Sequence, residues 1–279
     1  MTYSAEISRA NPTCFLFLID QSGSMADPFG TGESRRPKAQ GVADAVNKLL
    51  QNLVITASKP EVRDYYSVGV IGYGAAVGPA FAGDLQPNQL NPISAIADKP
   101  AHIEERTKKV EDGAGGLVEQ TVKFPIWFEP TSNGQTPMCE ALALAKNILD
   151  PWASDHKTSF PPVVVHITDG ESTDGDPLPA MSALKAISTE DGNALLFNLH
   201  LSGKHSGPEI AFPSSLEAHL DQYAHTLFEG ASRLTPFMLS VAKEHGISVA
   251  DDARGFVLNS SLELVIQAID IGTRPAALR

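Results

Sequence analysis

Cysteine is scarce in this chain, which holds only Cys14 and Cys139 among its 279 residues. Two thiols so far apart in the sequence cannot build a disulfide framework, and neither has a second thiol at the spacing of a zinc site. We therefore expect both to be small apolar side chains of the core. This cysteine content fits a protein of the cytoplasm.

Long apolar runs are also missing. No stretch approaches the roughly 20 residues of a membrane-spanning helix. The N-terminal residues Met1–Arg9 lack the basic segment and the long apolar core of a secretory signal. We expect a cytoplasmic protein without membrane insertion.

Positive charge is in short supply: 21 Lys and Arg residues stand against 33 Asp and Glu residues, which gives a net charge of −12. Binding to a nucleic-acid backbone needs clustered Lys and Arg, so we expect no nucleic-acid partner. The apolar content of 42% and the charged content of 19% are ordinary for a globular protein. They argue against wholesale disorder.

Apolar runs of strand length recur along the chain, with helical segments between them. Their apolarity is continuous rather than alternating, which is typical of strands covered on both faces of a parallel sheet. We expect strands at 15–19, 67–73, 163–168, 194–201 and 255–258, and helices after Pro37, at 141–149 after Pro137, and at 179–187, 231–244 and 262–269. This alternation predicts an α/β fold, with a doubly wound, mostly parallel sheet and helices on both faces.

One insertion, at about 75–130, interrupts this alternation, because it is too long for a plain connection. Within it, 102–110 and 117–124 flank the glycine-rich segment Glu111–Gly116, which predicts a hairpin. We expect an antiparallel edge extension of a single domain, 1–279, with a core at about 13–272. Trp127 and Phe128 follow the hairpin and form either an apolar rim of a site or part of the packing beneath it.

The first apolar run ends abruptly in polar side chains. The stretch CFLFLIDQSGSM, residues 14–25, contains Asp20, Ser22 and Ser24 at its end. The third strand is followed by Asp169, and the segment NGQTP places Thr136 at a helix start as its N-cap. Ligands of a doubly wound sheet bind at the carboxyl ends of its strands, so we expect these five side chains to meet at one edge.

Two carboxylates and three hydroxyls form an oxygen-only donor set. Such a set suits a hard cation, Mg²⁺ or alternatively Mn²⁺ or Ca²⁺. Residues two apart in an extended loop point the same way, so Ser22 and Ser24 can face one ion, and Gly23 allows a tight turn between them. A serine-rich loop that only caps the next helix would carry the same local pattern. Three oxygen clusters at one edge favour the metal site.

The segments IDQSGSM, GQTP and HITDGES, in this order, closely resemble the von Willebrand factor type A (vWA) domain. Its metal-ion-dependent adhesion site has the pattern Asp-x-Ser-x-Ser, Thr, Asp. The resemblance covers about residues 13–272, and every motif position is filled. It implies that Ser22, Ser24 and Thr136 ligate the metal directly, whereas Asp20 and Asp169 do so directly or through water. The lack of a signal peptide, together with the closing segment IDIGTR at 269–274, resembles stand-alone bacterial members, some of which resemble TerY, found with tellurite-resistance gene groups.

The resemblance implies a protein-binding module and not an enzyme. Neutral hydroxyl ligands leave the cation poorly neutralised and with an open position, which a Glu or Asp carboxylate of a protein partner can fill. Two other functions stay open. One is a metal-dependent phosphohydrolase with Asp20 as nucleophile, although Ser22 stands where such enzymes generally carry a second carboxylate. The other is a scaffold that binds its partner without metal.

Overall fold

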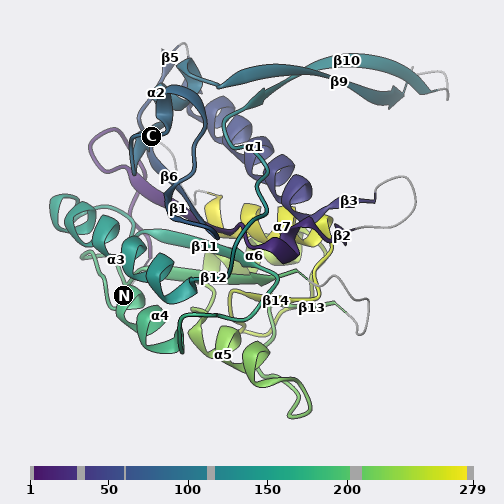
Figure 1. Ribbon diagram of the computed structural model, residues 1–279. Helices are drawn as coiled ribbons and strands as arrows, with labels where there is room; N and C mark the ends of the chain where they lie inside the picture. The colour runs from purple at the N-terminus through teal and green to yellow at the C-terminus, as the bar shows by residue number, and fades with distance from the viewer. Residues whose placement is uncertain (1–2, 30–34, 60, 112–116, 202–208, 275–279) are drawn as a thin grey trace.

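The computed structural model describes residues 3–29, 35–59, 61–111, 117–201 and 209–274 (Figure 1). Eight of the described strands form one sheet in the order β13-β14-β12-β11-β1-β6-β7, and β8 also pairs with β6. These strands are β1 (Thr13–Asp20), β6 (Tyr66–Tyr73), β7 (Val77–Pro79), β8 (Asn91–Pro92), β11 (Val163–Thr168), β12 (Leu195–His200), β13 (Ile210–Ala211) and β14 (Phe256–Leu258). All five strands expected from the sequence are present.

The central strands β14, β12, β11, β1 and β6 run parallel. The strand order reverses between β1 and β11, because the chain goes from β1 to β6 on one side and builds β11, β12 and β14 outward on the other. Ile19 pairs with Ile167, so the carboxyl ends of β1 and β11 lie level. A crevice outside the strand ends at such a reversal is where open α/β sheets bind ligands.

Helices cover both faces of the sheet, as Figure 1 shows. On one face, α1 (Lys38–Ala57), α6 (Pro236–Glu244) and α7 (Leu262–Thr273) share a core cluster with Phe15 and Phe17 of β1. On the other face, α3 (Met138–Asp155), α4 (Leu178–Lys185) and α5 (Gln222–Gly230) share a second cluster with Leu16 and Leu18 of β1. Burial on both faces explains the continuous apolar runs. The predicted fold class is confirmed.

Two helices differ from the sequence expectation. The helix expected at 231–244 begins at Pro236, because the side chain of Thr235 accepts a hydrogen bond from Met238 N at 3.3 Å and ends the preceding extended segment. Helix α5 was not expected. Its N-cap is Asp221, whose carboxylate accepts a hydrogen bond from Ala224 N at 2.7 Å.

The remaining described elements are short. They are the antiparallel pairs β2 (Pro28–Phe29) with β3 (Arg36–Pro37) and β4 (Ser58–Lys59) with β5 (Glu61–Val62), the 3₁₀ turns η1 (Gly23–Ala26) and η3 (Gly83–Leu85), and α2 (Ile93–Asp98). None of the helices within the described ranges combines the length and the hydrophobicity that crossing a bilayer requires.

The insertion contains the predicted hairpin, formed by β9 (His102–Glu111) and β10 (Leu117–Ile126). The glycine-rich turn at 112–116 lies outside the described residues. The hairpin forms its own two-stranded sheet and projects from the body as an arm (Figure 1). The prediction that this hairpin extends the edge of the main sheet is therefore wrong, because β7 and β8 already occupy the free edge of β6 as its antiparallel neighbours.

Helix α1 holds the base of this arm. Asn47 accepts hydrogen bonds from the backbone N–H groups of Trp127 and Phe128, at 2.9 and 3.0 Å, and its amide donates to Phe128 O at 2.8 Å. Trp127 and Phe128 are buried, so they belong to the core beneath the hairpin and the alternative of an apolar rim is wrong.

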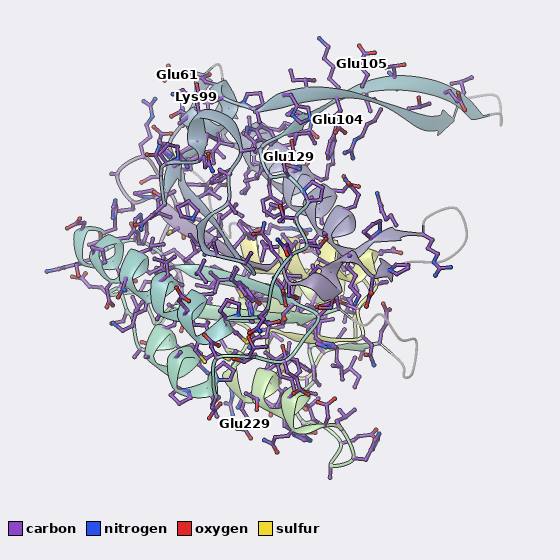
Figure 2. The ribbon with its side chains drawn as sticks, in the orientation of Figure 1. Glu61, Lys99, Glu104, Glu105, Glu129 and Glu229 are labelled. Carbon is purple, nitrogen blue, oxygen red and sulfur yellow. The ribbon has the colours of Figure 1, made fainter. Side chains whose placement is uncertain are left out.

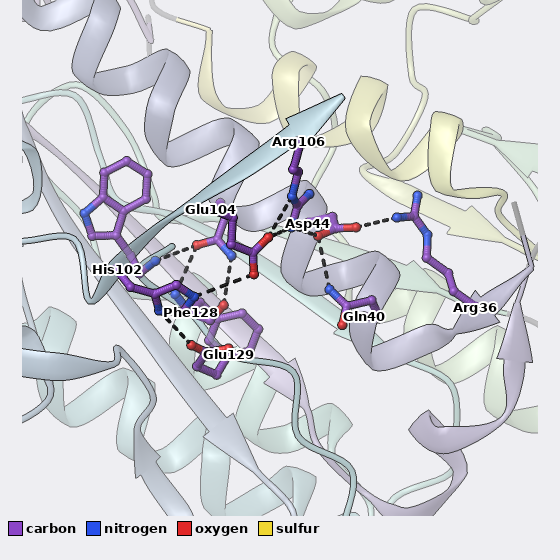
Figure 3. Close-up of polar contacts among 10 residues, drawn as sticks. Arg36, Gln40, Asp44, His102, Glu104, Arg106, Phe128 and Glu129 are labelled. Carbon is purple, nitrogen blue, oxygen red and sulfur yellow. Dashed lines mark hydrogen bonds and ion pairs between the residues drawn. The ribbon is translucent and has the colours of Figure 1, made fainter. Parts of the chain in front are cut away.

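Charged side chains strengthen the same junction (Figure 3). One carboxylate of α1, Asp44, accepts from Arg106 of β9 at 2.9 Å and also pairs with Arg36. The Arg106 guanidinium lies 3.8 Å from the ring centroid of Phe124 and pairs with Glu104 at 2.7 Å. The arm is therefore fixed to α1 at its base.

Candidate metal centre

Asp20 ends β1 at the point where the strand order reverses. Its Oδ1 accepts a hydrogen bond from Ser22 N at 2.8 Å, and its Oδ2 accepts one from the Thr168 hydroxyl at 2.7 Å. The side chain is fully buried. Burial raises the pKa of Asp20, the nearby charge of Asp169 adds to this, and the hydrogen bonds from Ser22 and Thr168 act in the opposite direction. Asp20 is thus a fixed anchor beneath the loop.

The serine hydroxyls form a short chain that leads to the second carboxylate. Ser22 Oγ lies 3.1 Å from Ser24 Oγ, and Ser24 Oγ donates to Asp169 Oδ1 at 2.7 Å. The chain therefore links the loop after β1 to the loop after β11. Four of the five predicted residues, Asp20, Ser22, Ser24 and Asp169, lie together.

Thr136 reaches the same place from the loop before α3. A Cβ atom added at Gly170 would lie 3.7 Å from Thr136 Oγ1 and 3.9 Å from Ser24 Oγ, so both oxygens face the space over Gly170. The backbone fixes this loop against the one after β1, because Gly23 N donates to Gly134 O at 3.1 Å and Asn133 N donates to Gln21 O at 2.6 Å. The structure brings the fifth predicted residue to the same edge.

The predicted capping role of Thr136 is wrong. Helix α3 begins at Met138. Its N-cap residue is Pro137, whose side chain makes no capping hydrogen bond. The cap comes instead from the loop after β11, where Asp174 accepts from Cys139 N at 3.0 Å and Glu140 N at 2.9 Å. Partial burial alone would raise the pKa of Asp174, but these N–H groups hold it below its ordinary value. The Thr136 hydroxyl is left to face the site.

Cys139 corrects a second expectation. Cys14 is buried in the core as predicted, whereas Cys139 is only half-buried, because it lies in the first turn of α3. Its Sγ lies 3.7 Å from Ser172 Oγ.

Lys38, the first residue of α1, is a component that the sequence pattern did not reveal. Its ammonium lies 2.6 Å from Asp169 Oδ2 and 3.9 Å from Asp27 Oδ2. The Lys38 and Asp169 side chains are 4% and 0% exposed, so this ion pair is shielded from water. No periodicity marks Lys38 as a site residue, since a lysine at a helix start usually lies in solvent.

A second layer supports Asp20. Thr168, the last residue of β11, donates to Asp20, and Tyr223 of α5 donates in turn to Thr168 Oγ1 at 3.4 Å. The ring of His200 packs edge-on against Tyr223. Burial lowers the pKa of His200, which favours the neutral ring. The sequence pattern does not reveal these residues, because their roles depend on contacts between segments that lie far apart in the chain.

The donor set fits a hard divalent cation on chemical grounds. All the candidate donor atoms are oxygens, which hard divalent cations prefer. They belong to the hydroxyls of Ser22, Ser24 and Thr136 and the carboxylates of Asp20 and Asp169. Within the described ranges, no three His, Cys, Asp or Glu side chains gather at metal-binding distance, so a site built from those types alone is not formed there. Serine and threonine hydroxyls would therefore have to supply the remaining ligands of a cation bound here.

No protein-family model and no curated protein matches this chain. Several solved structures resemble it. Proximal thread matrix protein 1 from the mussel byssus is 14% identical, with a TM-score of 0.48, over 96% of this chain and 49% of that one. The vWF domain of the pili tip protein Mfa5 from Porphyromonas gingivalis is 13% identical, with a TM-score of 0.32, over 58% of this chain and 39% of that one.

Another such structure is the manganese-loaded TRAP protein of Plasmodium vivax. It is 13% identical, with a TM-score of 0.35, over 68% of this chain and 57% of that one. This chain therefore spans about half the length of the mussel protein and less than two thirds of the other two.

Proposed function

We propose that this chain is a vWA-type module that binds a divalent cation through Asp20, Ser22, Ser24, Thr136 and Asp169 and uses it to hold an acidic group of a protein partner. The observation that carries the proposal is the chain of oxygens Ser22–Ser24–Asp169, with links of 3.1 and 2.7 Å, at the reversal of the strand order. Mg²⁺ is the cation we favour, with Mn²⁺ and Ca²⁺ as alternatives.

The five residues would divide the work by their surroundings. Ser22, Ser24 and Thr136 would offer neutral hydroxyl oxygens to the ion. Asp169 would offer Oδ1, while its Oδ2 is held by Lys38. Asp20, which is buried and hydrogen-bonded at both oxygens, would hold the Ser22 loop in place.

Partner recognition follows from this charge distribution. The bound cation would supply local positive charge in a protein of net charge −12. Ser24 is exposed, so the ion would lie where a partner can reach it. A Glu or Asp carboxylate that completes the coordination shell would make a strong charge-assisted contact.

The geometry favours binding over phosphoryl transfer. A nucleophilic Asp20 would need a carboxylate oxygen free to attack the phosphorus atom. Both oxygens of Asp20 instead accept hydrogen bonds, and the side chain is fully buried. If the native protein hydrolyses a generic phosphoester and Asp20→Asn does not, phosphohydrolase would become the preferred function.

The test is calorimetric titration of Mg²⁺, Mn²⁺ and Ca²⁺ into metal-stripped protein, followed by acetate as a carboxylate probe. We expect saturable binding by the native protein and its loss in Thr136→Ala, which removes one hydroxyl. The matched control is Thr131→Ala, in the same loop but exposed and outside the site. No binding to folded native protein, or equal binding by Thr136→Ala, would favour the scaffold that needs no metal.

The finer assignments stay predictions. They are the cytoplasmic location, the bacterial and TerY-like origin, and the extent of the single domain. Each rests on the sequence alone.

A further inference from the structure

The β9–β10 arm has strand edges that no other described strand covers. Within the described residues, β9 and β10 pair with each other and with no other strand. Each strand has 10 residues, and the arm stands clear of the body in Figure 1. An unpaired edge of this length presents a row of free N–H and C=O groups, which is a template for another strand.

The side chains of β10 are arranged symmetrically about its centre. Glu119, Thr121 and Lys123 share one face of the strand, because they are two residues apart, and all three are exposed. On β9, Lys109 lies directly opposite Glu119 and Glu105 lies directly opposite Lys123. One negative and one positive charge therefore flank Thr121 at equal distances.

We infer that β10 pairs with β10 of a second copy of this chain, antiparallel and centred on Thr121, so that the two arms form one continuous four-stranded sheet. In this register, Glu119 of each copy lies opposite Lys123 of the other, and the charge pair forms twice. Val118, which is 47% exposed, lies opposite Phe124 on the other face. Opposite charges and apolar side chains at directly opposed positions stabilise antiparallel strands.

Other pairings of the arm are less favourable. A parallel pairing in register would set Glu119 against Glu119, which is destabilising. Self-pairing of β9 about Thr107 would also set Glu105 opposite Lys109, but it would set Arg106 against Lys108 in both halves. Arg106 is moreover already bound to Asp44 of α1. The β10 edge is thus the one suited to a second copy.

The proposed register sets how the two bodies would lie. Antiparallel pairing brings the base of one arm beside the outer end of the other, so the two bodies lie at opposite ends of the shared sheet. The labelled side chains in Figure 2 agree with a free outer face, since Glu105 points away from the body and Glu104 lies on the body side. Pro125, near the base, has no N–H group, so the shared ladder ends there.

Sedimentation equilibrium of the full chain over a range of concentrations tests the inference. The native protein should show a monomer–dimer equilibrium. Lys123→Glu and Glu119→Lys should each raise the dimer dissociation constant by about tenfold or more, because each places like charges opposite one another twice. The double variant Glu119→Lys/Lys123→Glu restores opposite charges and should return the constant to within about threefold of the native value.

The matched control is Lys99→Glu, the same charge reversal on an exposed residue of the body, which should leave the equilibrium near that of the native protein. All substituted side chains are exposed, and circular dichroism would check that each variant is folded. The inference would be overturned by a monomer at every concentration, or by a dimer dissociation constant that is unchanged in the single variants. A double variant as weak as the singles would overturn it too, since the charges would then not face each other.

Discussion

The ammonium group of Lys38 lies 2.6 Å from Oδ2 of Asp169, and neither side chain is more than 4% exposed. The candidate metal centre thus contains a cation supplied by the chain itself. Lys38 neutralises one of two carboxylates that would otherwise repel each other, which helps to hold the loop after β11 in place before any metal binds. The same charge opposes an incoming divalent ion.

Replacing Lys38 by Met should therefore change metal affinity and stability in opposite directions. Without the ammonium, we expect affinity for Mg²⁺ or Mn²⁺ to rise by roughly tenfold or more, because the repulsion is removed. The metal-free protein should lose about 3 kcal/mol of unfolding free energy, since Asp169 is left buried and unpaired. Calorimetry and urea unfolding in EDTA measure the two effects. Lys38→Arg keeps the charge and serves as control; unchanged affinity in Lys38→Met would contradict the expectation.

Gly134 positions Thr136, and an alanine there should weaken metal binding without removing a ligand. Gly134 has φ = +91°, and an added Cβ would lie 2.3 Å from Ala75 N, so the loop has to shift. We expect Gly134→Ala to lower metal affinity by roughly tenfold, as is usual when the support of a ligand is disturbed. Gly78→Ala is the control, because its Cβ would meet nothing within 4 Å. If calorimetry gives Gly134→Ala the same metal affinity as the native protein, the loop accommodates the added methyl group without displacing Thr136.

His166 should make stability depend on pH. Its ring is fully buried between the Tyr73 hydroxyl, 2.6 Å from Nε2, and Asn198 Oδ1, 2.9 Å from Nδ1. Burial lowers the pKa of His166 from 6.5 to about 4, against a smaller opposing effect of the Asn198 hydrogen bond. The unfolded chain therefore binds a proton at this residue below pH 6.5, whereas the folded protein does so only near pH 4.

It follows that the contribution of His166 is complete above pH 6.5 and is lost as the pH falls toward 4. Between pH 7 and pH 5 we expect a loss of about 2 kcal/mol from this residue. Urea unfolding of metal-free protein at several pH values measures it. In His166→Gln, which cannot take up the proton, the slope over this range should be smaller; parallel slopes for the two proteins would contradict the assignment.

Asn47 should be a major support of the arm. Its buried side chain makes three hydrogen bonds to the backbone of Trp127 and Phe128. Asn47→Ala leaves those backbone groups without partners, so we expect the free energy of unfolding to fall by about 3 kcal/mol. Asn52→Ala, on an exposed turn of the same helix, should change it by no more than about 0.5 kcal/mol. Equal effects in urea unfolding would mean that water replaces the lost contacts.

Features that depend on neighbouring residues of the chain could be predicted from the amino-acid sequence. The parallel strands are read from continuous apolar runs, because burial on both faces removes the need for polar alternation. Asp20, Ser22 and Ser24 are found because a strand end and its loop are contiguous in the chain. Thr136 and Asp169 followed from the rule that strand ends of one sheet share an edge. The hairpin was visible as two runs around a glycine-rich turn.

Contacts between segments that lie far apart in the chain became visible with the three-dimensional structure. Lys38 reaches Asp169 across 131 positions of the chain, and no local pattern marks a lysine at a helix start as buried. Asp174 caps α3 from another loop, which leaves the Thr136 hydroxyl free for the site. The hairpin became an arm instead of an edge of the main sheet because β7 and β8 already pair with β6. Such outcomes depend on competition between partners in space, which sequence spacing does not encode.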